Sequence, residues 1–320
     1  MNARRSILGL AAAALVLPLG EAWAADEFPN RELTLVVNFG PGGVTDLASR
    51  ELAREMSAQL QKPIVIANRP GALGTLGPAY VAKRKPDGYE LAVVSASATT
   101  IAPRLMDVQL ELKDLKFAAG FGINRYGIVV RSDSPYKTIA DLVAAGKTGK
   151  SIFFGSPSTP NTILMLELGR LSKSQFELVA YKSGPETAAA LLGGQVEVIA
   201  ANPAEVLAHI QSGKLRLIGS GSSKRWPEYP DVPTLREAGY PIGYDAWMGV
   251  AAPAGTPDKV VDTLQASIEK ALQSDKLQDT FKRIGVEARF MGGAAYTRHL
   301  VDEAAQMKQL IEISKIQPIK

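Results

Sequence analysis

The residues of this 320-residue chain that are best arranged for chemistry lie in the stretch "GPGGVTD", residues 40–46, between an apolar run and a helical pattern. Glycines allow backbone N–H groups to approach a ligand closely, and the start of the helix that follows favours a negative charge. The stretch lacks the lysine of a phosphate-binding P-loop and the third glycine of a dinucleotide-binding turn. We therefore predict a site for a carboxylate-sized anion; the alternative is a plain turn with Thr45 or Asp46 as the helix cap.

A second glycine-rich loop, "RPGALGTLG" (69–77), follows the next strand-like run, and polar residues stand at the ends of later runs. The carboxyl ends of parallel strands meet at one edge of a sheet, where α/β proteins bind ligands. Each polar cluster alone suits a turn or a helix cap, but together they would line this edge with neutral groups that bind an anion without reacting with it. The candidates are Ser95, Ser97, Thr99, Ser156, Thr159, Asn161, Ser183 and Asn202.

Residues for covalent or metal chemistry are scarce. The chain has no cysteine, and its two histidines, His209 and His299, lie in helical patterns without the partner of a zinc-protease motif. No nucleophile elbow and no metal-ligand spacing occur. We therefore predict a binding protein with no catalytic residue, no cofactor and no metal. An exported hydrolase or isomerase with Asp46 as base is the rival, although a helix cap is the favoured role for Asp46.

The beginning of the chain resembles a secretory signal. Arg4 and Arg5 precede an apolar stretch at 7–19, and Ala22-Trp23-Ala24 matches a cleavage pattern. Residues 1–24 are therefore predicted to be a signal peptide that is removed on export to the periplasm, with the export route left open. Cleavage takes away two arginines and one glutamate, which lowers the formal charge from +4 to about +3. This mild charge, without a basic block, argues against a nucleic-acid partner, and no later apolar run is long enough to embed the mature protein in a membrane.

The elements that must position these residues follow an α/β pattern. Apolar runs at 33–37, 63–68 and 89–95 alternate with helical patterns, the first of which carries Ala48, Leu52, Met56 and Leu60 on one face. This order predicts a parallel sheet covered by helices. A second α/β unit covers roughly 131–245. There, Ser183 with Glu186 has the spacing of a capping box, and Asn202 is a helix N-cap with Glu205 at the third helical position.

The tail is mainly helical, at 258–273, 276–284 and 294–313, with one strand in "VEARF". Since no new sheet follows, the tail should return to the first unit, so that the chain crosses twice, near 126–131 and 244–251. Two crossings would make a hinge with a cleft between two lobes. We expect a signal peptide at 1–24, a discontinuous first domain at 25–128 and 246–320, and a second domain at 129–245.

The ordered motifs resemble the Bug family, the periplasmic substrate-binding proteins of tripartite tricarboxylate transporters. They include "LTLVVNFGPGGVTDLASRELA", "PIVIANRPGALGTLG", "LLGGQVEVI", "PDVPTLREAGYP" and "APAGTPDKVV", and span nearly the whole mature chain. The resemblance implies a two-lobed α/β fold, the type II periplasmic-binding-protein fold, and a ligand carboxylate held by the first two loops, partly through ordered waters. The matching positions, with Phe39 just before the first turn, are Phe39, Gly42, Gly43, Thr45, Asp46, Ala72, Leu73 and Gly74.

The resemblance also implies a function. We expect a monomer that captures a small organic carboxylate, either a di- or tricarboxylate or an aromatic carboxylate, and delivers it to membrane permease subunits. A ligand-sensing subunit for a membrane kinase would have the same site and stays an alternative. Ala201 stands where many members carry an aspartate, which argues against an amino acid as ligand. Pro157 and Pro160 also depart from the family pattern, in the loop that would shape the far side of the pocket.

Overall fold

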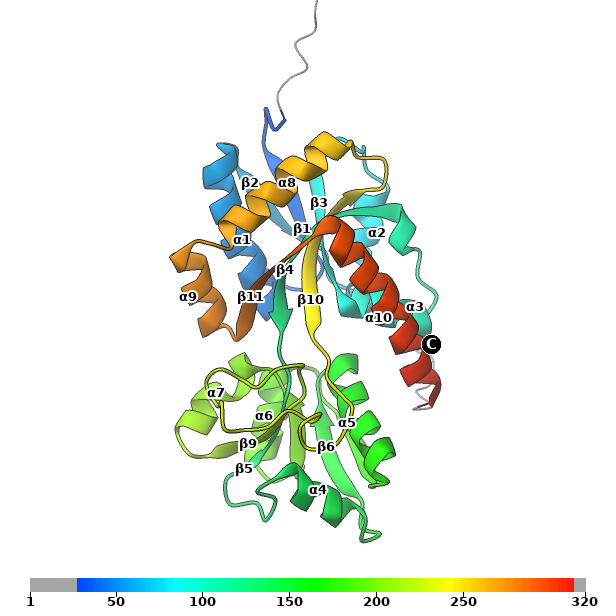
Figure 1. Cartoon of the computed structure of the whole chain (residues 1–320), viewed down its shortest axis with the longest axis vertical. Coiled ribbons are helices and arrows are strands. Elements are labelled where there is room, and N and C mark those ends of the chain that lie inside the picture. Colours follow the sequence, from blue (N-terminus) through cyan, green and yellow to red (C-terminus); the bar gives the residue numbers. More distant parts are fainter. Residues whose placement is uncertain (1–27, 314–320) are drawn as a thin grey trace, which may run out of the picture.

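The computed structural model describes residues 28–313, so the predicted signal peptide lies outside the described residues. The chain forms two lobes along its long axis, each built on its own β-sheet (Figure 1). The strand order is β11-β4-β10-β3-β1-β2 in the first sheet and β7-β6-β8-β5-β9 in the second. The predicted two-lobed α/β architecture is therefore present.

The first lobe contains both ends of the described chain. Its elements before the crossing are β1 (Leu33–Val37), α1 (Val44–Leu60), β2 (Ile64–Asn68), η1 (Ala72–Gly74), α2 (Leu76–Ala82), β3 (Glu90–Ser95), the π-helix η2 (Ser97–Ile101), α3 (Ala102–Leu105), η3 (Leu112–Asp114) and β4 (Leu115–Asn124). Its elements after the return are β10 (Ala246–Pro253), α8 (Asp258–Ala271), α9 (Asp275–Arg283), β11 (Val286–Gly292) and α10 (Gly293–Ile313).

The first sheet is mixed. Strands β1, β2 and β3 are parallel, as their alternation with helices predicts, whereas β10 runs antiparallel between β3 and β4. The sequence pattern did not identify β4, because Gly120 and Gly122 interrupt it and glycine is depleted in strands. Both glycines have a packing reason. A Cβ at Gly120 would lie 2.8 Å from the Trp247 ring, and one at Gly122 would lie 3.0 Å from Val286.

The tail returns to the first lobe as predicted. The inner face of α1, with Ala48, Leu52 and Met56 fully buried, packs against α8 and α9. In the same apolar core lie Leu264 and Phe281 of those two helices. Strand β11 adds to the free edge of β4. Burying each such Leu or Phe side chain contributes about 1.5–3 kcal/mol, so the returning tail is an integral part of this core.

The second lobe repeats the α/β pattern around a mixed sheet. Strands β6, β7 and β8 are parallel, and β5 runs antiparallel between β8 and β9. Its elements are β5 (Gly127–Arg131), α4 (Ile139–Gly146), β6 (Ile152–Ser156), α5 (Thr159–Ser172), β7 (Phe176–Ala180), α6 (Gly184–Leu192), β8 (Val198–Ala201), α7 (Pro203–Gln211) and β9 (Leu215–Ser220).

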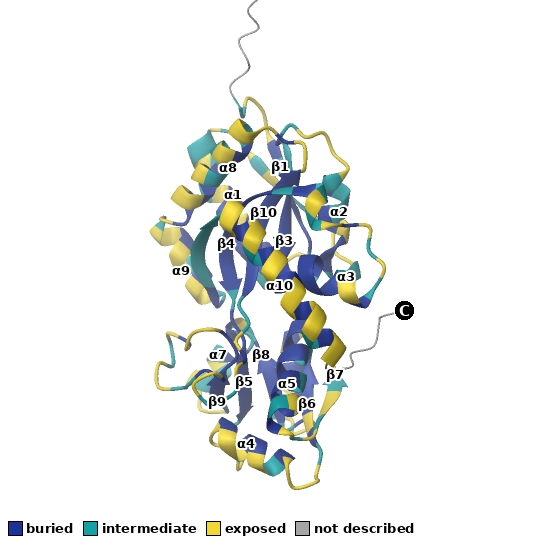
Figure 2. Cartoon of the chain, turned by 45° about the vertical axis from the view of Figure 1, so that its right-hand side comes forward, coloured by how far each residue is buried: buried dark blue, intermediate teal, exposed yellow. Residues whose placement is uncertain are grey.

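The chain passes between the sheets at two points, after β4 and before β10 (Figure 1). At the first crossing Arg125, only 5% exposed, donates from both terminal guanidinium nitrogens to the Glu228 carboxylate at 2.9 and 3.0 Å. Helix α10 adds a third connection, because Met307 and Ile311 pack with Ile163 of α5 in an apolar cluster. Figure 2 shows α10 buried along this inner side and exposed along the outer one. Within 28–313, none of the helices is long and apolar enough to cross a membrane.

Candidate ligand-binding site

A cleft of about 780 Å³ lies between the lobes, with walls from the strand-end loops of both sheets and from the two crossing segments. The predicted site residues that line it are Phe39, Gly43, Thr45, Leu73, Ser95, Ser97, Thr159, Asn161, Ser183 and Asn202. The predicted residues outside its lining are Gly42, Asp46, Ala72, Gly74, Thr99 and Ser156. The position of each follows from its local structure.

The start of α1 forms the first wall. Gly43, not Thr45 or Asp46, is the N-cap, with φ −73° and ψ 165°. Position 42 requires glycine because its φ is +80°, in a region that residues with side chains disfavour. The Gly42 N–H donates to Asp46 Oδ2 at 2.9 Å. The N–H groups of Val44 and Thr45, which line the cleft, stand at the helix start where no intrahelical acceptor exists. The free N–H groups at this helix start are therefore two and three residues later than Gly42.

Asp46 supports the loop from behind. It is 1% exposed and accepts from Arg50 Nε at 2.8 Å, from Asn68 Nδ2 at 2.8 Å and from the Gly42 N–H. Burial alone would raise the pKa of Asp46, but hydrogen bonds from Arg50, Asn68 and Gly42 outweigh it and hold the pKa below its ordinary value. A carboxylate that is this well satisfied, and away from the cleft, is a poor general base.

The second loop places only Leu73 in the cleft. Ala72 and Leu73 both have left-handed backbones, with φ of 47° and 54°. Gly74, at φ +89°, leaves no room for a side chain, because a Cβ there would lie 2.7 Å from Asn38 Nδ2. Ala72 and Gly74 therefore shape the turn that presents Leu73.

The segment after β3 divides its hydroxyls between the cleft and the interior. Ser95 Oγ accepts from Asn38 Nδ2 at 3.0 Å, and Ser97 Oγ donates to the Leu73 carbonyl at 3.1 Å; both line the cleft. Thr99 is turned inward, where Oγ1 donates to the Ser95 carbonyl at 2.9 Å. The π-helix η2, which sequence periodicity did not predict, sets this orientation. Such helices are frequent at functional sites.

On the second lobe, the start of α5 faces the cleft through Ser158, Thr159 and Asn161. Ser156 lies behind them and donates to the Ser158 carbonyl at 2.9 Å. Asn161 is 1% exposed, and its Nδ2 donates to the Ala200 carbonyl, so it ties the start of α5 to β8.

Helices α6 and α7 also begin at the cleft. Ser183 caps α6 by accepting from the Glu186 N–H at 3.3 Å, but the Glu186 carboxylate accepts from the Lys182 N–H, so only half of the predicted capping box forms. Asn202 caps α7 as predicted, and its Nδ2 donates to the Arg125 carbonyl at 3.0 Å. This bond attaches the start of α7 to the first crossing.

Other cleft residues escaped the sequence analysis. Tyr126 and Trp247 come from the crossing segments, and Lys182 and Glu205 come from the second lobe. Glu205 was identified only as a helix-start residue. Burial raises its pKa to about 7, although the Asn202 N–H partly opposes the shift. Glu205 lies beside the cleft because of the way α6 and α7 pack, and local sequence patterns do not predict such packing.

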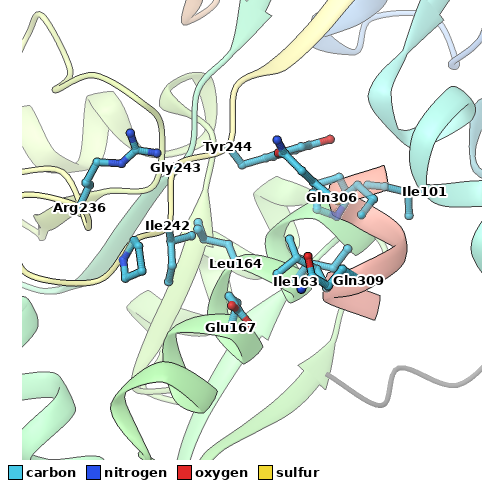
Figure 3. A pocket seen from close by; sticks show the side chains of 14 residues that line it. Ile101, Ile163, Leu164, Glu167, Arg236, Ile242, Gly243, Tyr244, Gln306 and Gln309 are labelled. Atoms are coloured by element: carbon cyan, nitrogen blue, oxygen red, sulfur yellow. The ribbon is translucent and has the colours of Figure 1, made fainter. Parts of the chain in front are cut away.

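A second cavity of about 330 Å³ lies between α5, α10 and the segment before β10 (Figure 3). Its walls are mixed: Ile163, Leu164 and Ile242 lie near its centre, and Arg236, Gln306 and Gln309 add polar groups around them (Figure 3). Glu167, at one side, is already paired with Arg170. Within residues 28–313, no group of His, Asp or Glu side chains is arranged to hold a metal ion. The larger cleft is the better candidate for a carboxylate, because the predicted strand-end loops and the starts of α1, α5, α6 and α7 meet there.

Comparison with known proteins agrees with this geometry. The sequence profile described as "Tripartite tricarboxylate transporter family receptor" matches residues 48–316. Protein BugT of Bordetella pertussis is 34% identical over 271 residues, which cover 82% of each chain. Two solved structures have similar folds. Rpa4515 of R. palustris with adipate gives a TM-score of 0.80 at 26% identity, covering 92% of this chain and 100% of the other. MatC of Rhodopseudomonas palustris with bound malate gives 0.75 at 27%, covering 89% and 100%.

These matches identify the architecture as the periplasmic-binding-protein fold expected from the motifs. They also confirm that the chain is related to binding proteins rather than to enzymes, so the rival with Asp46 as a base is set aside. The chain belongs to the tripartite tricarboxylate transporter receptor family, that is, to the Bug family of solute-binding proteins.

Proposed function

We propose that this protein is an exported binding protein that holds a small organic carboxylate in the cleft between its lobes and delivers it to the permease of a tripartite transporter. The observation that carries the proposal is the convergence of helix starts: α1, α5, α6 and α7 all begin at the cleft, through Thr45, Thr159, Gly184 and Asn202. Helix starts carry unpaired N–H donors and favour negative charge. Relatives with adipate and malate support a carboxylate as the ligand class.

In this proposal the first carboxylate binds at the start of α1, to the N–H groups of Val44 and Thr45, with Ser95 and Ser97 beside it. Charge-assisted hydrogen bonds contribute about 1.5–3 kcal/mol each. Three of them would give roughly 5–9 kcal/mol before ordering costs, whereas a micromolar site needs about 8 kcal/mol. The donors on the first lobe can therefore supply a large part of the affinity.

The second lobe would close over the rest of the ligand through Thr159, Asn161, Ser183 and Asn202. The two crossings then act as a hinge between a first domain at 25–128 and 246–320 and a second domain at 129–245. The separate sheets of the two lobes support this division. Closure would bring helix starts of both lobes onto one ligand and so make affinity depend on domain movement.

Export with removal of residues 1–24, a periplasmic location and a monomeric state belong to the same proposal. The test is to measure binding of a panel of mono-, di- and tricarboxylates by calorimetry. Uptake of the tightest-binding ligand is then measured in cells that lack the gene for this protein. Saturable one-to-one binding and lost uptake are expected. Tight binding with unchanged uptake would refute delivery and favour the sensing role, and absence of binding across the panel would refute the carboxylate site.

A further inference from the structure

Charge is unevenly distributed in the cleft. Its first-lobe wall consists of neutral residues, whereas Lys182 and Glu205 are the charged side chains among the described residues that line the cleft. Lys182 is exposed, and Glu205 is half-buried at the start of α7. A carboxylate is unexpected in a site for anions, because two like charges in a cleft of reduced dielectric repel each other.

The Glu205 carboxylate is held in a defined position. Its Oε2 accepts from the Asn202 N–H at 2.9 Å. Gly184, the first residue of α6, makes room for it, since a Cβ on Gly184 would lie only 1.9 Å from Oε1. Among the described residues, Oε1 has no hydrogen-bond partner, so one oxygen completes the helix start and the other remains available to the cleft.

We infer that Glu205 selects carboxylates whose far end carries a hydrogen-bond donor, a hydroxyl or an ammonium group, over those that end in a second carboxylate. The inference rests on the proposed function, which places the first carboxylate at the start of α1 on the opposite lobe. The donor at the far end then meets Glu205 Oε1. Ala201, the last residue of β8, has no such acceptor, so Glu205 is the acidic side chain that this part of the second lobe brings to the cleft.

The charged and titratable groups around Glu205 do not prevent it from accepting a hydrogen bond from the ligand. Lys182, which directly precedes the N-cap of α6, donates its backbone N–H to Glu186, and among the described residues its side chain forms no ion pair with Glu205. The Arg125 guanidinium is occupied by Glu228. The Tyr126 hydroxyl is neutral, because burial raises its pKa. Because burial raises the pKa of Glu205 to about 7, the ionised form, which accepts a donor, is more populated at about pH 8 than at about pH 6, where more of the protonated form can donate to a carboxylate.

The test uses two matched series of probes that differ only at the far end. The first is butanoate, 4-hydroxybutanoate, 4-aminobutanoate and succinate; the second is hexanoate, 6-hydroxyhexanoate, 6-aminohexanoate and adipate. Calorimetry at about pH 8 should give the hydroxy or amino member of one series at least about tenfold tighter binding than its dicarboxylate, equivalent to about 1.4 kcal/mol. In Glu205→Gln this ratio should fall to about threefold or less, and the wild-type ratio should also fall at about pH 6.

Glu205→Gln is suited to the test because glutamine also serves at the third position of a capping box. Asp141→Asn is the matched control. Asp141 holds the same helical position in α4 of the same lobe and accepts from the Thr138 N–H, but it does not line the cleft. This control should keep the wild-type ratio.

The outcomes separate the two proposals. If succinate or adipate binds best, or if Glu205→Gln leaves the ratio unchanged, the inference is wrong while the carboxylate site stands. If the ratio also falls in Asp141→Asn, Glu205 acts only through the stability of the lobe and the inference is wrong. If no member of either series binds, the proposed function fails together with the inference.

Discussion

Replacing Gly43 by valine should weaken carboxylate binding about 100-fold or more while the protein still folds. The Gly43 backbone has φ −73°, which any residue can adopt. A Cβ at Gly43 would meet only the Gly40 carbonyl oxygen, at an ordinary contact distance of 3.6 Å. The rest of the valine side chain would occupy the space in front of the Val44 and Thr45 N–H groups, where we place the ligand carboxylate.

The magnitude follows from the bonds that are lost. Two charge-assisted hydrogen bonds at about 1.5–3 kcal/mol each amount to roughly 3–6 kcal/mol, and about 1.4 kcal/mol corresponds to a factor of ten in affinity. The cost to folding is smaller. Valine is a poorer N-cap than glycine by about 1 kcal/mol, which lowers the midpoint of thermal unfolding by about 2–4 °C in a protein of this size class.

Gly42→Ala is the matched control, because it should lower stability and leave carboxylate affinity nearly unchanged. Gly42 has φ +80° and does not line the cleft, so alanine there should cost about 1–2 kcal/mol of stability and leave affinity within about threefold. Calorimetry with the tightest-binding carboxylate, and thermal unfolding without ligand, measure both variants. If Gly43→Val binds with wild-type affinity, the glycines serve only the turn and the carboxylate does not bind at the start of α1.

Three further outcomes are expected. Glu303, 5% exposed on α10, has its pKa raised to about 8 by burial. The folded state therefore holds the proton of Glu303 more tightly than the unfolded state does. The resulting contribution to stability is fully present below about pH 4.5 and is lost as the pH rises through 8. Glu303→Gln should therefore remove a loss of as much as about 4 kcal/mol between about pH 5 and pH 8, measured by urea unfolding, and an equal pH dependence in both proteins would contradict this. Asp46→Asn should lower stability by about 1–3 kcal/mol, because Arg50 and the Gly42 N–H lose their charged acceptor, while a bound carboxylate is recovered chemically unchanged from both proteins; conversion of the ligand by the wild type alone would revive the enzyme reading. Small-angle scattering should show a smaller radius of gyration with ligand if the free form is open, and an open form that stays open when saturated would argue against the hinge.

The sequence predicts what depends on local pattern. The buried face of α1 and the caps Ser183 and Asn202 follow from spacing alone, and the structure has all of them. Strand β4 was not predicted, because Gly120 and Gly122 interrupt its pattern. These positions require glycine because side chains from other elements pack closely on them. Tertiary packing is invisible to periodicity.

The same limit applies to the candidate site. Thr99, Ser156 and Asp46 are the right residue types at strand ends and helix starts, yet each is turned toward backbone or side-chain partners behind the cleft. Conversely, Tyr126 and Glu205 reach the cleft because of the crossing geometry and the packing of α6 on α7. Side-chain direction at an interface between lobes requires the structure.

A crystal structure of the protein with its tightest-binding carboxylate would show directly whether the ligand binds at the start of α1. We predict ligand carboxylate oxygens within about 3.2 Å of the Val44 and Thr45 nitrogens, at the start of α1, with the far end of the ligand against the second lobe. A ligand carboxylate bound elsewhere, for example in the cavity between α5 and α10 with the start of α1 unoccupied, would contradict the proposed site at the start of α1.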